Sequence, residues 1–502
     1  MNQTASLSLR LLFLFVASTL ATMVAAIPNA GAQQASQVRL TLRQALKMAR
    51  EQSPSALTAM HRYRASYWQY VTFKADYRPT FDLNAIPVQW ERTIELQTLP
   101  DGTDAFVPRS QANSSGSLAL SKVVTLTGGR ISLRSSIERT KEIEGNTPSA
   151  YSATPIQLAY DQPIFSYNSY KWGLRIEPRR FAEARQMAVE DLENVSLTAM
   201  GYYFDLLSSQ ASLREALTER TRAETLVAVV RRRYAAGKVP ENDVLQAELS
   251  NLNSDIRLTR ARVDVESKQQ RLGNYLGVGD DRTFELETAT DVPAPTVDLE
   301  TAIAEAKRNR PTAMAWVRTL IEADRSVAQA RSTGGNTWLH ASYGLSNTTD
   351  DFSNLYREQR TDQQAVFAVS FPIVDWGRSR ARVAVAESQR EVTKRSVEQA
   401  QVDFERDIFF KVTQFQIQAK QLQLTFRADS IADRRYQKLR ERYLNGEGDM
   451  NSVNIALNEK DSARRGYLDA QRSYWSAYYD LRRGTLYDFE RRQPIPPPKV
   501  SF

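Results

Sequence analysis

The sequence predicts a mainly α-helical, internally duplicated protein with a smaller β-strand region in each half. A stretch of the form Arg-Tyr-x-x-Gly joins two long helix-periodic segments, and it occurs twice, around Tyr234 and Tyr443. These tyrosines lie 209 positions apart, and so do Pro163 and Pro372 in a second matched pair of segments. Between the helical segments the apolar period changes to two, which is typical of strands. Two landmarks on one offset indicate an internal duplication.

The composition is that of a folded chain exposed mostly to water. The 502 residues are 42% hydrophobic and 25% charged, with a net charge of +8. The basic residues are interspersed with acidic ones along the helices, so we expect no nucleic-acid partner. Cysteine is absent, which excludes disulfides, thiolate metal sites and an acylated cysteine anchor.

The N-terminus, residues 1–32, has the form of a secretory signal peptide. Arg10 precedes an apolar run from Leu11 to Ile27, and the run is followed by Ala30-Gly31-Ala32, a small-x-small cleavage pattern. A retained membrane anchor is the alternative, although Pro28 is more typical of a cleavage region. We therefore expect an exported protein.

The mature chain opens with two consecutive helices. Thr41 and Gln44 have the spacing of a capping box, which predicts a short amphipathic helix ending at Ser53. Pro54 is suited to the first position of a second helix, which we expect to reach about Tyr77.

The second half repeats this plan. Asp298 is expected to cap a helix that runs to Arg310, and Pro311 to begin another that reaches about Ala330. These elements are 257 positions from their counterparts instead of 209, so the first half carries about 48 extra residues before Pro163.

The extra residues fall in the region with a period of two. Its alternating sets are Phe81, Leu83 and Ala85; Leu118 and Leu120; Ile131, Leu133 and Ile137; and Leu158, Tyr160 and Gln162. We expect a tight turn at 127–129 and a loop at 100–116. The second half shows two strands, 338–343 and 366–371. The excess is most simply an additional hairpin, which leaves four or six strands per chain.

Each strand region is followed by a long helical hairpin. We expect a helix from about Arg179 to Tyr234 with a return to about Tyr275, and a second pair at 378–443 and 451–481. The first return helix carries a heptad seam formed by Leu245, Leu249, Leu252, Ile256 and Val263.

The predicted organisation therefore has four parts. They are a signal peptide at 1–32, a first repeat at 33–296, a second repeat at 297–490 and a Pro-rich tail at 491–502. Strands occupy about 80–165 and 337–373, and the hairpins about 179–276 and 378–485.

Four to six strands are too few for a closed membrane barrel, because the smallest single-chain outer-membrane barrels have eight. Strands that enter lipid must leave no unpaired edge, so several chains would have to share one barrel. The alternative is a small soluble sheet at the end of a coiled coil.

The sequence resembles the TolC family of outer-membrane efflux channels over nearly all of the mature chain. The features that carry the resemblance are Leu42-Arg43-Gln44-Ala45-Leu46 before Ser53-Pro54, the strand ends Gln162-Pro163-Ile164-Phe165 and Phe371-Pro372-Ile373-Val374-Asp375-Trp376-Gly377, the two Arg-Tyr-x-x-Gly turns, and Asp243-Val244-Leu245-Gln246-Ala247. The resemblance implies a homotrimer with one shared β-barrel in the outer membrane of a Gram-negative bacterium and a long helical barrel across the periplasm. Its partners would be a periplasmic adaptor protein and an inner-membrane pump, in tripartite efflux or type I secretion.

The resemblance also implies roles for individual residues. The periplasmic tip, with its gate and adaptor contact, would comprise Arg233, Tyr234, Gly237, Val239, Asp243, Arg442, Tyr443, Gly446, Glu447 and Asp449. The strand-to-helix junctions would comprise Pro163, Pro372, Trp376 and Gly377. For each tip residue, ordinary coiled-coil packing is the alternative. Where the family's well-studied member places an acidic ring, this chain has Ser452 and Ile455.

An enzyme is not expected, because the sequence lacks a nucleophile motif and a Gly-rich phosphate loop. His61 and His340 lie in non-corresponding segments, and we expect no metal and no cofactor. The competing function is that of a periplasmic coiled-coil adaptor or scaffold. An adaptor would usually show one hairpin, whereas this chain shows two at a fixed repeat.

Overall fold

The computed structural model describes residues 36–98, 102–143, 149–279, 282–288, 295–332, 336–445 and 450–499. The predicted signal peptide lies outside them. The described chain forms two compact units. The first unit contains 36–53 and 199–288, and the second unit contains 54–198 and 295–499.

The helices follow the predicted plan. They are α2 (Leu42–Gln52), α3 (Pro54–Ala75), α4 (Ser169–Ala235), α5 (Glu241–Leu276), α6 (Leu299–Asn309), α7 (Pro311–Ser332), α8 (Arg378–Leu444) and α9 (Met450–Thr485), with a 3-10 turn η1 (Phe352–Asn354). The strands are β1 (Ser36–Leu40), β2 (Thr80–Thr98), β3 (Asp104–Val124), β4 (Gly129–Glu142), β5 (Ala150–Ile164), β6 (Arg282–Leu286), β7 (Asn336–Thr349), β8 (Arg360–Ser370), β9 (Tyr487–Asp488) and β10 (Gln493–Pro494).

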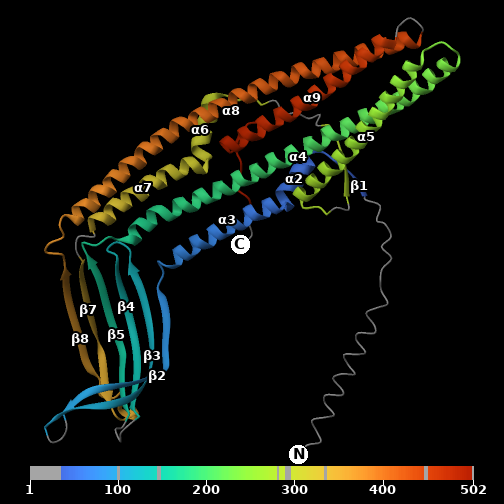
Figure 1. Ribbon diagram of the computed structural model, residues 1–502. Helices are drawn as coiled ribbons and strands as arrows, with labels where there is room; N and C mark the ends of the chain where they lie inside the picture. The colour runs from blue at the N-terminus through green and yellow to red at the C-terminus, as the bar shows by residue number, and fades with distance from the viewer. Residues whose placement is uncertain are drawn as a thin grey trace, which may run out of the picture. The chain divides into compact units, whose positions relative to one another are not determined.

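The second unit contains a six-stranded antiparallel sheet in the order β2-β3-β4-β5-β7-β8 (Figure 1). The first half supplies β2 to β5 and the second half β7 and β8, so the additional hairpin is confirmed. The expected loop at 100–116 is wrong, because β3 already begins at Asp104. Its Pro, Ser and Gly residues suit a loop, but the strand is held by pairing with both β2 and β4.

One row of apolar side chains crosses the sheet from strand to strand. The paired positions are Phe81, Leu120, Leu133, Leu158 and Tyr343, one on each of β2, β3, β4, β5 and β7. All five side chains are between 40% and 70% exposed. Successive residues of a strand point to opposite faces, so one face of the sheet carries an uncovered apolar band.

The sheet meets the helices of the second unit at one end of its strands (Figure 1). The Tyr77 hydroxyl, after α3, donates to the Tyr170 carbonyl at the start of α4 (2.9 Å), and the Asn168 side chain donates to the Thr125 carbonyl in the β3–β4 turn (2.9 Å). A Cβ on Gly173 would lie only 2.7 Å from the Tyr77 hydroxyl oxygen. The absence of a side chain at this position therefore allows the two segments to approach closely.

A buried ion pair joins α4 to α9 in the second unit. The Arg482 guanidinium donates to Glu193, which is fully buried, and to the Asp488 carboxylate at 2.9 Å. Burial alone would lower the pKa of Arg482, but the charge of Glu193 and its hydrogen bonds outweigh burial and raise it. The guanidinium therefore stays charged in the core.

A parallel pair of short strands, β1 and β6, lies in the first unit. The Tyr203 hydroxyl of α4 lies 3.1 Å from the Leu40 carbonyl oxygen and 2.5 Å from that of Glu287, and the Gln210 side chain bonds both Phe284 and Leu286. The strands pair residues about 246 positions apart, as Ser36 with Arg282, so no local pattern predicted them.

Two sequence expectations for the helices are confirmed and one is wrong. The capping box at Thr41 and the Asp298 cap are both present. However, α4 begins at Ser169 instead of Arg179, and Pro178 lies inside it. The loss of one backbone hydrogen bond at the proline is tolerated where Phe181 stacks on Tyr70 of α3, with ring centroids 4.8 Å apart.

The predicted heptad seam of α5 does not pack within its own unit. Leu245, Leu249, Leu252, Ile256 and Val263 are all at least 50% exposed, whereas Ala247, Ser254 and Leu258 are buried. The seam is therefore available to another surface. No helix in the described part of the chain is both long enough and apolar enough to cross a bilayer.

Candidate functional site

The first hairpin turn, in the first unit, is closed by a left-handed glycine. Gly237 has φ of 67°; its N–H donates to the Tyr234 carbonyl (2.8 Å), and the Lys238 N–H donates to the Arg233 carbonyl (2.8 Å). This pair of bonds is a Schellman motif, which satisfies the last carbonyls of α4. Pro240 then precedes α5.

The side chains of this turn are exposed or half-buried, and none is packed in a core. Arg233 and Tyr234 are exposed, and Val239 and Asp243 are half-buried. Within the described residues, the side chains of Arg233 and Tyr234 make no hydrogen bond or ion pair. Asp243 lies in the first turn of α5, where a negative charge is favourable to the helix dipole.

Only part of the second hairpin turn is described. Arg442 lies in the last turn of α8 and is exposed. The side chain of Tyr443, and all of Gly446, Glu447 and Asp449, lie outside the described residues. The structure therefore places Arg442 at the turn end of the α8–α9 hairpin. The tip positions of Glu447 and Asp449 stay predictions.

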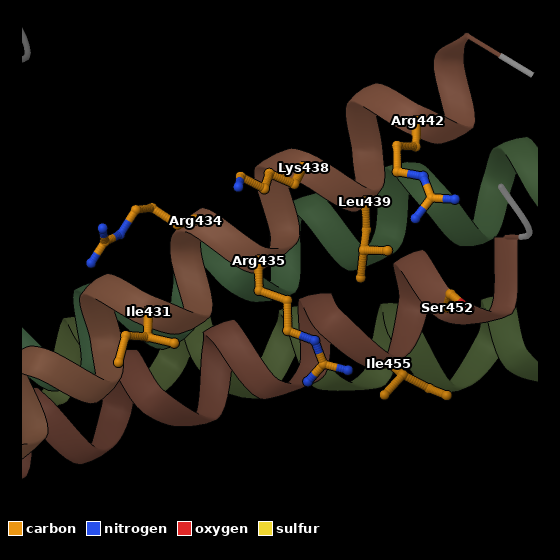
Figure 2. Close-up of a pocket in the computed structure, with 8 residues that line it drawn as sticks. All are labelled: Ile431, Arg434, Arg435, Lys438, Leu439, Arg442, Ser452 and Ile455. Atoms are coloured by element: carbon orange, nitrogen blue, oxygen red, sulfur yellow. The ribbon is translucent and has the colours of Figure 1, made fainter. Parts of the chain in front are cut away.

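A basic cleft of about 690 Å³ lies next to this turn (Figure 2). It is lined by Ile431, Arg434, Arg435, Lys438, Leu439, Arg442, Ser452 and Ile455. Figure 2 shows the cationic side chains coming from α8, with Ser452 and Ile455 on α9. Ser452 and Ile455, the two positions that the resemblance compared with an acidic ring, thus line the same cleft as this cluster of cations.

Most carboxylates near the cleft are already paired across the hairpin. Arg435 pairs with Glu459, Lys460 with Asp433 at 3.0 Å, and Arg464 with Asp429 at 3.1 Å. No ion pair is made by Arg434, Lys438 or Arg442 in the part of the chain that the structure describes. Among the described residues, three positive charges of the cleft therefore have no partner carboxylate.

The sequence analysis did not identify Arg434, Lys438 and Ile431 as site residues. Arg434 and Arg435 are among the basic residues interspersed with acidic ones along the helices, which is typical of a solvated helix face, and both are exposed. The available signal was the spacing of Arg434, Lys438 and Arg442, since residues four apart lie on one helix face.

The four predicted junction residues lie where strands give way to helices in the second unit. Pro163 is near the end of β5, and Pro372, Trp376 and Gly377 lie between β8 and α8. Trp376 has φ of 56° and Gly377 φ of 82°, so the chain turns sharply there. Asp375 accepts bonds from the Gly377 and Ser379 N–H groups at 2.9 and 3.0 Å and so caps α8.

Comparison with known proteins places the chain in a family. The family model described as "Outer membrane efflux protein" matches residues 123–278 and 302–485. The chain belongs to the outer membrane efflux protein family. The two matched segments agree with the internal duplication, and a search of curated protein sequences gave no match.

Solved structures of similar fold include three bacterial proteins. The outer membrane channel CmeC of Campylobacter jejuni is 14% identical, with a TM-score of 0.61 over 88% of this chain and 85% of that one. The outer membrane protein VceC of Vibrio cholerae is 16% identical, with a TM-score of 0.57 over 89% and 95%. A membrane protein from Pseudomonas aeruginosa is 15% identical, with a TM-score of 0.59 over 88% and 90%.

This outer membrane efflux protein is therefore an exit duct located in the outer membrane and extending into the periplasm. The family assignment decides between the two functions left open by the sequence, in favour of the channel over the adaptor. The family is one of transport channels. Among the described residues, no group of three His, Cys, Asp or Glu side chains is placed to hold a metal ion.

Proposed function

We propose that three copies of this chain form the outer-membrane duct of a tripartite efflux or type I secretion system, with a single barrel shared by all three. The observation that carries the proposal is the six-stranded sheet with two free edges, β2 and β8. A sheet edge cannot remain unpaired in lipid, where its N–H and C=O groups find no water.

Pairing β8 of one copy with β2 of the next would close a ring of eighteen strands, because each copy supplies six. β2 runs away from the helices and β8 runs back to them, so the new pair would be antiparallel like the others. Eighteen strands lie within the range of known outer-membrane barrels.

The apolar row of the sheet supports this placement. Phe81, Leu120, Leu133, Leu158 and Tyr343 form a continuous band that would face the acyl chains. The exposed α5 seam offers a second apolar surface for a neighbouring copy. Burial of both surfaces would stabilise the assembly.

A crosslinking experiment tests the shared barrel. Because the chain has no native cysteine, only the introduced cysteines can form disulfides. Leu83→Cys in β2 is combined in turn with Ala365→Cys, Phe367→Cys or Val369→Cys in β8, which lie on the same face of the sheet as Leu83. Oxidation in outer-membrane vesicles should produce covalent dimers and trimers for at least one register. In the matched control, Leu133→Cys in the interior strand β4 replaces Leu83→Cys. This variant should stay monomeric after oxidation.

We infer that the turn residues form the periplasmic gate and the contact with an adaptor protein, which would carry an inner-membrane pump. In support, Arg233, Tyr234 and Arg442 are exposed and make no side-chain hydrogen bond among the described residues, so they are available to neighbouring chains. Charge-assisted bonds from such arginines could hold a closed pore.

Single-channel recording in planar bilayers tests the gate. Arg233→Ser combined with Tyr443→Phe should raise the conductance, because both changes remove the groups that are proposed to hold the closed pore by hydrogen bonds to neighbouring chains. Arg232→Ser combined with Tyr436→Phe changes the same residue types nearby and should leave the conductance unaltered. Equal conductance in the wild type and the first variant would show that these residues do not form the gate.

A further inference from the structure

A second cavity, of about 440 Å³, lies in the second unit where β5 passes into α4, beside the end of α7. Phe165, Tyr167, Lys171 and Trp172 line it from the β5–α4 segment, and Arg331 lines it from α7. It lies beside the last residues of the strands, and therefore at the level where the sheet would leave the hydrocarbon core of the membrane.

The cavity carries positive charge that the described residues neutralise only in part. Arg331 is already engaged with Glu387 at 2.7 Å. Lys171 and Arg175 are exposed and form no ion pair within the described ranges. The Arg175 guanidinium lies over the Trp172 ring, 4.8 Å from its centroid, which orients it while leaving its N–H groups available.

Large aromatic side chains project from the same level of the molecule. Phe165 is 93% exposed and Trp376, at the β8–α8 junction, is 95% exposed. Both have φ of 56°, a left-handed conformation that non-glycine residues rarely adopt. The surrounding chain therefore holds two aromatic rings outward against both backbone preference and water, which is favourable where rings enter a membrane interface.

We propose that this cavity binds the phosphate of an anionic phospholipid from the periplasmic leaflet. Lys171 and Arg175 donate to the phosphate oxygens, Arg331 adds its remaining N–H groups, and Phe165 inserts beside the acyl chains. A basic pocket beside an exposed aromatic matches the two ends of such a lipid, since one end is a desolvated anion and the other is apolar.

Native mass spectrometry of the detergent-extracted assembly, titrated with dioleoyl phosphatidylglycerol, tests the proposal. Lys171→Gln combined with Arg175→Gln should weaken lipid binding by roughly 10- to 30-fold, since each cation near the membrane surface contributes about a fivefold factor. Lys394→Gln combined with Arg406→Gln makes the same charge change on exposed residues of α8 and should leave binding unaltered.

Two further arms identify the ligand. Phosphatidylcholine with the same acyl chains should bind more weakly than phosphatidylglycerol, because its headgroup has no net charge. Inorganic phosphate at millimolar concentration should not displace the lipid, because it lacks the acyl chains that contact Phe165. Equal lipid binding by both charge variants, or full displacement by inorganic phosphate, would overturn the proposal. Neither readout depends on how the duct opens or on which adaptor it meets.

Discussion

The two halves of the chain have helices of identical lengths but different sheets. α2 and α6 have 11 residues, α3 and α7 have 22, α4 and α8 have 67, and α5 and α9 have 36. The first half nevertheless supplies β2 to β5 to the sheet and the second half only β7 and β8. An added β-hairpin satisfies its own backbone N–H and C=O groups, because its two strands pair with each other and with the next strand of the sheet. A sheet therefore tolerates an added hairpin more readily than a helical hairpin tolerates a change of length.

Matched positions in the two hairpins also carry different chemistry. Arg482, in the buried ion pair of α9, corresponds to Gly273 of α5 on the 209-residue offset. Arg434 and Lys438 of the basic cleft correspond to Thr225 and Val229. The two halves thus share a backbone plan, and at these three positions only the second half carries a charge.

The largest expected effect comes from the buried ion pair. Arg482→Ala should lower the free energy of unfolding by about 3–5 kcal/mol, because it removes the guanidinium that pairs with the buried carboxylate of Glu193. Denaturant unfolding of the detergent-extracted protein, followed by circular dichroism, measures it.

The matched control is Gly273→Ala, whose added methyl would make only ordinary contacts with Val278 and Phe284. It should be neutral or stabilising by up to about 1 kcal/mol, since alanine is the better helix former. Equal losses in the two variants would mean that the halves do not differ at this position.

The turn glycine gives the next effect. Gly237→Ala places a side chain at φ of 67° and should destabilise the first turn by about 1 kcal/mol. Amide hydrogen exchange around Lys238 should then quicken by about fivefold. Gly201→Ala, inside α4 with open space around the new methyl, should not quicken exchange. Gly446→Ala repeats the test in the second half, where the same increase would show that both turns close alike.

The basic cleft predicts a difference in ion selectivity. Neutralising it with Arg434→Gln, Lys438→Gln and Arg442→Gln should raise the K⁺-to-Cl⁻ permeability ratio about twofold, because a cluster of cations enriches anions locally. Reversal potentials in a KCl gradient measure the ratio. The control replaces three exposed cations elsewhere on α8, Lys394, Arg406 and Lys420, by Gln. An identical shift in the control would assign the effect to net charge and not to the cleft.

The smallest effect is the acid sensitivity of α7. Burial alone would raise the pKa of Glu322, but the hydrogen bond from Arg180 and the charge of Arg318 lower it below its usual value. A lowered pKa stabilises the fold at neutral pH, and that contribution disappears as the pH falls below about 4.5 and through the lowered value. The matched residue of α3 is Ala65, so the first half lacks this acid-dependent stabilisation.

Thermal melting between pH 7 and pH 3 measures the acid-dependent contribution of Glu322. Glu322→Gln should lower the melting temperature at pH 7 and make it less dependent on acid, whereas Glu266→Gln, exposed on α5, should do neither. A wild-type acid dependence that Glu322→Gln leaves unaltered would contradict the assignment.

The helical plan was accessible from sequence because its signals are local. Thr41, Pro54, Asp298 and Pro311 mark helix starts through caps and fixed φ, and the structure places helices there. The start of α4 was misplaced, because tertiary packing around Phe181 keeps Pro178 inside the helix.

The elements that sequence could not give depend on distant partners. β1 and β6 pair across most of the first half, and residues 104–116 of β3 form a strand because they pair with β2 and, from Gln111 onward, also with β4. At the tip, the Schellman turn at Gly237 follows from local sequence, whereas the cleft around Lys438 requires knowing which carboxylates of α8 and α9 are already paired.

The most direct test of the shared barrel is the oligomeric mass of the detergent-extracted protein, taken from a sucrose-gradient outer-membrane fraction and measured by light scattering corrected for bound detergent. Three chains per particle is the predicted result, because only a closed ring leaves β2 and β8 with no free edge in lipid. A monomer or dimer, or a protein found in the soluble periplasm, would contradict it.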